Sequence, residues 1–127
     1  MPQENMIVNT MNAPQAIGAY GQGVIFGNTV YFSGILGLNP EVMKLESNFD
    51  SQLSRIMKNM DALIESQNLK RENIIKTTIF LKDLSEFPKV NKAYEEYFTK
   101  PYPARTCIEV KGLPLNAEIE IEVIAGI

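Results

Sequence analysis

The sequence predicts an α+β fold in which one mixed β-sheet carries two helices on one face. Segments rich in β-branched and aromatic residues alternate with two segments whose apolar residues recur at three- and four-residue steps. Strand pairs are expected near both ends, with a helix, a strand and a second helix between them. With 127 residues, 45 % hydrophobic and 21 % charged, the chain is expected to form a single domain over residues 1–127.

The first predicted element is a β-hairpin over residues 24–32. A β-branched and aromatic run over residues 24–26 precedes Gly27-Asn28, and a similar run over residues 29–32 follows it. Two such runs on either side of a two-residue turn signal are typical of a hairpin.

An amphipathic helix is predicted from Phe49 to Leu69. Its apolar positions lie on one face and are Leu53, Ile56, Met57, Met60, Leu63 and Ile64. Three residues could cap its start, Ser47, Asn48 or Asp50. The helix is expected to end near Asn68, because asparagine tolerates the left-handed conformation that often follows a last helical turn.

Residues 74–81 predict a central strand that is covered on both faces, because the run is β-branched and nearly continuous in apolar character. Lys76 interrupts this run. Burying its ammonium without a partner is costly, which indicates a polar pocket at this point. The alternative is an edge position from which the ammonium reaches solvent.

A second helix is predicted from Ser85, with Pro88 in its first turn, and it must end before the two prolines of residues 100–103. The chain closes with two alternating strands over residues 105–110 and 118–124. A turn at residues 111–114 separates them, so we expect them to pair as a hairpin.

Composition excludes several classes of function. The net charge of −3 offers no basic excess for a nucleic acid backbone. The single cysteine, Cys107, excludes an intrachain disulfide, and the absence of histidine argues against zinc sites and His-dependent hydrolases. No apolar stretch reaches membrane-spanning length and no targeting signal is visible, so a cytoplasmic protein is expected.

The last two strands carry the residues best suited to chemistry. Arg105, Cys107 and Glu109 share one strand face. The other strand places three glutamates on one face, Glu118, Glu120 and Glu122. These faces could simply be solvated, with exposed pairs contributing ~0.2–1 kcal/mol each. Alternatively, Arg105 binds a substrate carboxylate through its bidentate fork while a glutamate accepts a proton from an attacking water.

Two further features allow both a functional and a purely structural interpretation. Tyr20 stands among three glycines within residues 17–23, in a loop that could approach a ligand or form a tight turn before the hairpin. Cys107 could be a nucleophile, but no histidine is available to activate it. The pattern therefore favours a small strand residue at this position.

Several short blocks occur in the order in which they stand in a known family. The blocks are Asn12-Ala13-Pro14, Ile17-Gly18-Ala19-Tyr20, Ser33-Gly34, Asn39-Pro40, Lys76-Thr77-Thr78, Val90-Asn91, Pro103-Ala104-Arg105-Thr106-Cys107-Ile108-Glu109-Val110, Leu113-Pro114 and Ile119-Glu120-Ile121-Glu122. In these blocks the sequence resembles the reactive intermediate deaminase A (RidA) family, also called the YjgF/YER057c/UK114 family. The resemblance runs from about Asn12 to Ala125, and its most specific parts are the Pro-Ala-Arg block and the last strand.

The resemblance implies a chorismate-mutase-like (YjgF-type) fold assembled as a homotrimer, with sites in the clefts between subunits. Family members hydrolyse 2-aminoacrylate, 2-aminocrotonate and the corresponding imines, 2-iminopropanoate and 2-iminobutanoate, to 2-oxo acids and ammonia. Pyridoxal-phosphate dehydratases release these compounds, and no cofactor or metal is needed. The resemblance thus implies a 2-iminobutanoate/2-iminopropanoate deaminase.

The resemblance also implies roles for individual residues. Arg105 would bind the substrate carboxylate, and Glu120 would position or deprotonate the attacking water. The cleft would be lined by Tyr20, which belongs to the catalytic group, and by Ser33, Lys76, Asn91 and the backbone around Cys107.

The sequence also departs from the family pattern. Ala19 replaces the usual proline before Tyr20, and Ile35 stands where many members have glutamine. These changes bear on substrate range and leave a second hypothesis open, a non-catalytic trimer that binds small carboxylates or acts as a chaperone or regulator. A third hypothesis, a ribonuclease or translation inhibitor, is opposed by the net charge of −3 and the absence of histidine.

Overall fold

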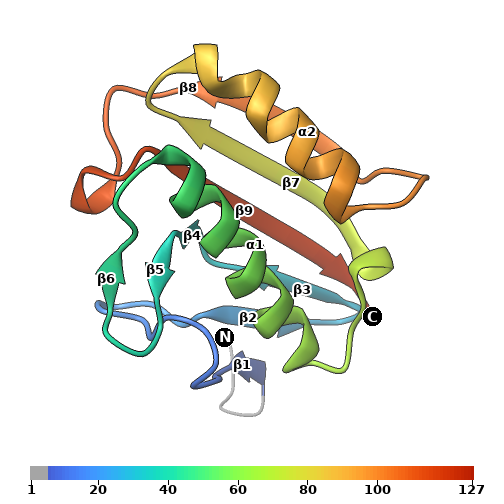
Figure 1. The fold of residues 1–127 in the computed structure, drawn as a ribbon. Coiled ribbons are helices and arrows are strands. Elements are labelled where there is room, and N and C mark those ends of the chain that lie inside the picture. The colour runs from blue at the N-terminus through green and yellow to red at the C-terminus, as the bar shows by residue number, and fades with distance from the viewer. Residues whose placement is uncertain (1–5) are drawn as a thin grey trace.

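A computed structural model describes residues 6–127, in which two helices lie on one face of a mixed sheet (Figure 1). The strands of the sheet lie in the order β1-β2-β3-β9-β7-β8, and β4 also pairs with β9. They are β1 (Ile7–Val8), β2 (Gly23–Phe26), β3 (Thr29–Phe32), β4 (Ile35–Leu36), β7 (Ile74–Leu81), β8 (Ala104–Glu109) and β9 (Ile119–Gly126). The remaining elements are the paired strands β5 (Leu38–Asn39) and β6 (Lys44–Leu45), the helices α1 (Phe49–Glu65) and α2 (Phe87–Tyr97), and the 3-10 turns η2 (Arg71–Asn73), η3 (Leu84–Glu86) and η4 (Pro114–Asn116).

The predicted first hairpin is confirmed. Strands β2 and β3 pair antiparallel, with Phe26 opposite Thr29. Gly27 adopts a φ of 61°, a conformation that costs glycine little and most other residues more. The two-residue turn therefore fixes the register of the hairpin.

Helix α1 is confirmed, and Asn48 is the cap among the three candidates. The Oδ1 of Asn48 accepts a hydrogen bond from the Ser51 amide at 2.9 Å, and the Ser51 Oγ accepts one from the Asn48 amide at 3.2 Å. The helix ends at Glu65, earlier than predicted, because the chain turns at Asn68 with a φ of 58°. That turn lets the Leu69 amide bond to the Ile64 carbonyl at 3.0 Å, so Leu69 packs in the core without being helical.

Strand β7 has the predicted bounds, but only one of its faces is covered. The core lies between the sheet and the helices, where the side chains of β7 and β9 are fully buried at Ile79, Leu81, Ile119, Ile121, Val123 and Ala125. The residues that alternate with them on β7, Lys76, Thr78 and Phe80, point to the opposite side and are partly exposed. The prediction of a strand covered on both faces is therefore wrong for this chain, and Lys76 lies on a central strand of the uncovered face, not at a sheet edge.

The predicted terminal hairpin is also wrong, because β7 lies between β8 and β9. Helix α2 makes a crossover connection, and such a connection brings β8 parallel to β7 with the helix on one face. Strand β9 then pairs antiparallel with the other side of β7. Figure 1 shows the result, with α2 over β7 and β8 and α1 across β4 and β9.

No helix within residues 6–127 is both long enough and apolar enough to cross a membrane.

A candidate site on two faces of the sheet

The register of the three central strands places the two main candidate residues on opposite faces of the sheet. Thr77 of β7 is opposite Arg105 of β8, so both side chains point to the helix side, where Thr77 is buried. Phe80 of β7 is opposite Glu120 of β9, and both point to the uncovered side. Within one chain, Arg105 and Glu120 therefore cannot act on the same small molecule.

Helix α2 holds the guanidinium of Arg105. Its Nη1 donates to Asn91 Oδ1 at 3.0 Å, and its central carbon lies 4.9 Å from the ring centroid of Phe87 and 5.4 Å from that of Tyr94. Such cation–π contacts contribute ~0.5–1 kcal/mol each at exposed positions. No carboxylate of residues 6–127 forms an ion pair with Arg105, so its charge is available to an anionic ligand. We call Arg105, Asn91, Phe87, Tyr94 and Cys107 the anchor half-site.

The remaining groups of the anchor half-site are neutral. Tyr94 donates to Thr77 Oγ1 at 2.8 Å, and burial raises the pKa of its hydroxyl to about 12. Burial also raises the pKa of the Cys107 thiol, although the nearby charge of Arg105 acts in the opposite direction. A protonated thiol favours the structural interpretation of Cys107 over a nucleophile. A cavity of about 340 Å³ adjoins Arg105 and Asn91.

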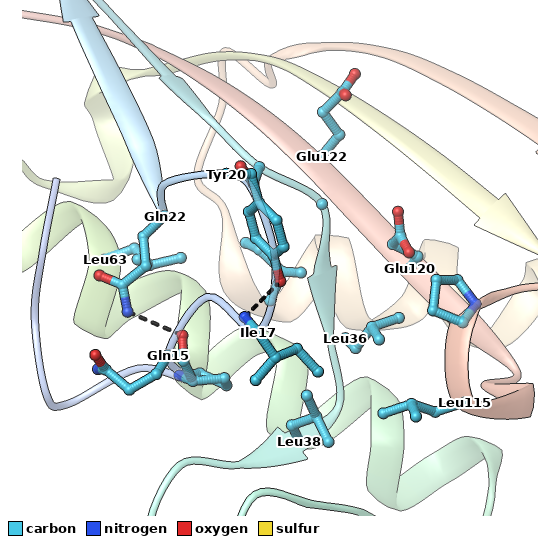
Figure 2. Close-up of a pocket in the computed structure, with 15 residues that line it drawn as sticks. Gln15, Ile17, Tyr20, Gln22, Leu36, Leu38, Leu63, Leu115, Glu120 and Glu122 are labelled. Atoms are coloured by element: carbon cyan, nitrogen blue, oxygen red, sulfur yellow. Dashed lines mark hydrogen bonds between the residues drawn. The ribbon is translucent and has the colours of Figure 1, made fainter. Parts of the chain in front are cut away.

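The second part of the candidate site is a cavity of about 600 Å³ beside Glu120 (Figure 2). Tyr20 stands over it on the loop before β2, and its hydroxyl accepts a hydrogen bond from the Ile17 amide at 3.4 Å. Ser33 also lines the cavity, but its Oγ donates to the Gly21 carbonyl at 2.6 Å and so fixes the same loop. We call Glu120, Glu122, Tyr20, Ser33 and Gly34 the carboxylate half-site.

The pKa of the Glu120 carboxyl, on the uncovered face, is raised from its ordinary value. Burial raises the pKa of Glu120, and the negative charge of Glu122 raises it further. Gly34 makes room for it, because a Cβ at that position would lie 2.8 Å from Glu120 Cδ and closer still to Oε2. No side chain or amide within residues 6–127 donates a hydrogen bond to the Glu120 carboxylate, which leaves its oxygens free to bind a water.

Most of the residues expected to form the site fall into one of the two half-sites, but Lys76 belongs to neither. Its side chain is partly exposed on the uncovered face, and it lines neither of the two cavities. The contribution of Phe87 and Tyr94 to the site was not predicted from the sequence. These two residues and Asn91 are spaced four and three positions apart on α2, so one helical stripe carries all three to Arg105. This spacing is visible in the sequence and indicates that the three side chains lie on the same face of the helix.

Comparison with known proteins covers nearly the whole chain. Residues 10–127 match the family described as Endoribonuclease L-PSP. A 2-iminobutanoate/2-iminopropanoate deaminase of Escherichia coli K12 is 43 % identical over 121 residues, which cover 93 % of this chain and 94 % of that protein. A RutC family protein of Aquifex aeolicus is 45 % identical over 120 residues, which cover 93 % of this chain and 96 % of that protein. The crystal structure of RidA from the Antarctic bacterium Psychrobacter sp. PAMC 21119 superposes with a TM-score of 0.92 at 38 % identity, covering 94 % of this chain and 98 % of that one.

Proposed function

Because the chain belongs to the Endoribonuclease L-PSP family, which is the RidA/YjgF family, we propose that it hydrolyses reactive 2-imino acids and their enamine tautomers to 2-oxo acids and ammonia. The activity proposed is that of a 2-iminobutanoate/2-iminopropanoate deaminase, the name carried by the 43 % identical Escherichia coli relative. One observation carries the proposal: within residues 6–127 Arg105 has no carboxylate partner, and Glu120, beside a cavity, is half-buried and free to hold a water.

The proposed chemistry divides between the two half-sites. Arg105 binds the carboxylate of the imino acid through a bidentate pair of hydrogen bonds, which fixes the carbon of the C=N bond. Glu120 accepts a proton from a water as the water oxygen bonds to that carbon. The nitrogen takes up this proton as the electron pair of the C=N double bond moves to it, which gives a carbinolamine. The C–N bond then breaks as the new hydroxyl passes its proton through Glu120 to the nitrogen, so ammonia leaves and the C=O group of a 2-oxo acid remains. An imine already reacts readily with water, so one carboxylate with a raised pKa supplies enough assistance.

This mechanism requires two copies of the chain, because one copy presents Arg105 and Glu120 on opposite faces of its sheet. The homotrimer expected from the family resemblance would meet that need, since each copy in a closed ring presents different surfaces to its two neighbours. Exposed Tyr31 and Ile108 on the uncovered face support an association there. The anchor half-site of one copy would then meet the carboxylate half-site of another.

The other predicted residues have supporting parts in this proposal. Asn91 orients Arg105, and Tyr20 and Ser33 line the cavity beside Glu120. The role of the backbone around Cys107 stays a prediction. The place of Lys76 in the cleft stays a prediction. The cytoplasmic location of the protein also stays a prediction. Pyridoxal-phosphate dehydratases are the proposed source of the substrates, because they release enamines that tautomerise to imines.

A dehydratase-coupled assay tests the proposed function. The purified chain, added to a threonine dehydratase, should accelerate 2-oxobutanoate release above the spontaneous rate. Arg105→Ala should abolish that acceleration while the assembly state stays unchanged. Arg55→Ala is the matched control, because Arg55 pairs with Glu46 at 3.0 Å and lines neither half-site. No acceleration by the wild-type chain, or full activity of Arg105→Ala, would contradict the proposal.

A non-catalytic carboxylate-binding protein is the alternative, and the pre-oriented pair of Arg105 and Asn91 favours it as far as binding is concerned. Calorimetry that detects 2-oxo acid binding in a chain without any deaminase rate would support this alternative, and a chaperone or regulatory role would then be the next to test. Ribonuclease activity would be revived only by RNA cleavage that survives both Arg105→Ala and Glu120→Ala.

A further inference from the structure

The cavity beside Glu120 continues into a cluster of apolar side chains. We call this cluster the apolar basin, and it consists of Ile17, Leu36, Leu38, Leu63 and Leu115. Figure 2 shows Leu36, Leu38 and Leu115 on one side of Glu120, with Ile17 between Tyr20 and Leu38. We propose that the apolar basin receives the substrate side chain, so that the chain prefers 2-imino acids with branched or long apolar side chains. This inference rests on the proposed deaminase function.

Two polar side chains that line the cavity are already hydrogen-bonded within the chain, so they do not offer free polar partners to a substrate side chain. Gln22 is buried, and its amide donates to the carbonyls of Thr10 and Pro14 at 3.0 and 2.9 Å. Ser33 is occupied with the Gly21 carbonyl. Glu120 and Glu122 form the acidic side of the cavity, and in the proposed mechanism the C=N group lies there, beside the water on Glu120. The substituent of that carbon then extends toward the leucines.

The backbone at Leu115 is an independent observation that supports the proposal. Leu115 has φ 58° and ψ 21°, a left-handed conformation that glycine or asparagine adopts with less strain than leucine. The side chain is 56 % exposed, so core packing does not offset this strain. A strained residue that faces a cavity is typical of functional sites. Binding an apolar substrate side chain explains why a leucine stands at this position.

The apolar basin is also larger than a small substrate needs. The imine derived from alanine carries one methyl group, which is too short to contact all of the leucines that line the cavity. The imine derived from leucine has three more carbons in its side chain than the imine derived from alanine. Because a single methylene in an apolar pocket changes kcat/KM by roughly tenfold or more, we expect the leucine-derived imine to exceed the alanine-derived one by at least about tenfold.

The experiment compares kcat/KM for the two imines, formed in situ from L-leucine and L-alanine by an L-amino-acid oxidase. Hydrolysis is followed as 2-oxo acid release in competition with semicarbazide. Two rim variants are used, Leu115→Gly and Ile17→Ser, because Ile17 is 63 % exposed and glycine suits the φ of 58° at position 115. Both should lower the leucine-to-alanine ratio about tenfold or more without loss of thermal stability.

Asn116→Gly is the matched control. Asn116 also has a φ of 58°, but its Oδ1 accepts a hydrogen bond from Lys82 Nζ at 2.6 Å, outside the cavity. It should keep the wild-type ratio. A wild-type ratio near one, or a ratio that falls equally in Asn116→Gly and Leu115→Gly, would overturn the preference and leave the deaminase function standing. No acceleration with either imine would overturn both.

Discussion

Glu120 occupies space that the absent side chain of Gly34 leaves open. The half-buried carboxylate reaches the cavity only because nothing extends from the opposing strand at this point. The relation between these two residues was not visible in the sequence, because they stand far apart in the chain and meet only through the pairing of β4 with β9.

Gly34→Ala should therefore reduce activity with little effect on folding. The added Cβ would displace Glu120, whose side chain can move because it ends at a cavity. A displacement of about 1 Å in a catalytic group costs up to ~100-fold in rate, so we expect kcat/KM to fall by about tenfold or more. Gly112→Ala is the matched control, because a Cβ there would meet no atom within 4 Å. Equal rates in the two variants would contradict this role of Gly34.

Glu120→Gln should inactivate the protein and stabilise it at neutral pH. The folded state raises the pKa of Glu120 above its ordinary value of 4.5, so the folded state binds the proton more tightly than the unfolded state. That contribution to stability is complete below pH 4.5 and is lost as the pH rises through the folded pKa. Urea denaturation across pH should show the gain of Glu120→Gln growing with pH. A gain that is constant or shrinks with rising pH would exclude this explanation.

Glu122→Gln should shift the acidic limb of the pH profile of kcat/KM to lower pH. The charge of Glu122 is the second cause of the raised pKa of Glu120, so its removal lets Glu120 ionise at lower pH. The profile is measured with the dehydratase-coupled assay at constant ionic strength. An unchanged limb would mean that Glu120 is not the group that must lose its proton.

At the scale of the elements, the sequence predicted local structure well and strand partners poorly. The hairpin at Gly27 and the cap at Asn48 depend on residues within one turn of each other, so their signals survive in a single sequence. The partner of β8 depends instead on the crossover through α2, which brings β7 between two strands that are neighbours in the chain. Which residues share a face with Arg105 or with Glu120 was therefore predicted correctly within each strand. Whether the two faces lie on the same side of the sheet could not be predicted.

Asn48→Ala should destabilise the fold by about 1 kcal/mol, because the first turn of α1 loses the acceptor for the Ser51 amide. The free energy of unfolding is measured by urea denaturation. Asn48→Asp is the control and should retain most of the stability, since aspartate accepts the same hydrogen bond. If Asn48→Ala and Asn48→Asp were equally destabilised, the loss would not come from the cap.

At the scale of the whole molecule, the sheet separates the anchor half-site from the carboxylate half-site. Helix α2 fixes Arg105 on one side, and the loops before β2 and after β3 build the cavity on the other. The residues themselves were found from strand alternation and from the family resemblance. The separation of the two half-sites was not predicted, because it follows from the register between strands that are distant in sequence.

Two inactive variants should therefore restore each other when they are combined. Arg105→Ala retains the carboxylate half-site, and Glu120→Gln retains the anchor half-site. If each site forms between neighbouring copies in a trimer, co-expression in equal amounts should produce about a quarter of the wild-type activity. Mixtures in which either variant is combined with the double variant are the control and should stay inactive. No recovery in the first mixture would place both groups in one copy.

The placement of Arg105 and Glu120 on opposite faces also has a consequence for the newly made protein. Under the proposed mechanism, a chain that has folded but has not yet met another copy holds both groups and can use neither. The rate of the reaction would then rise more steeply than in proportion to the protein concentration. The concentration at which activity appears would be set by the association of the copies. Dilution would silence the protein without unfolding it, and the cell could tune the activity through synthesis alone.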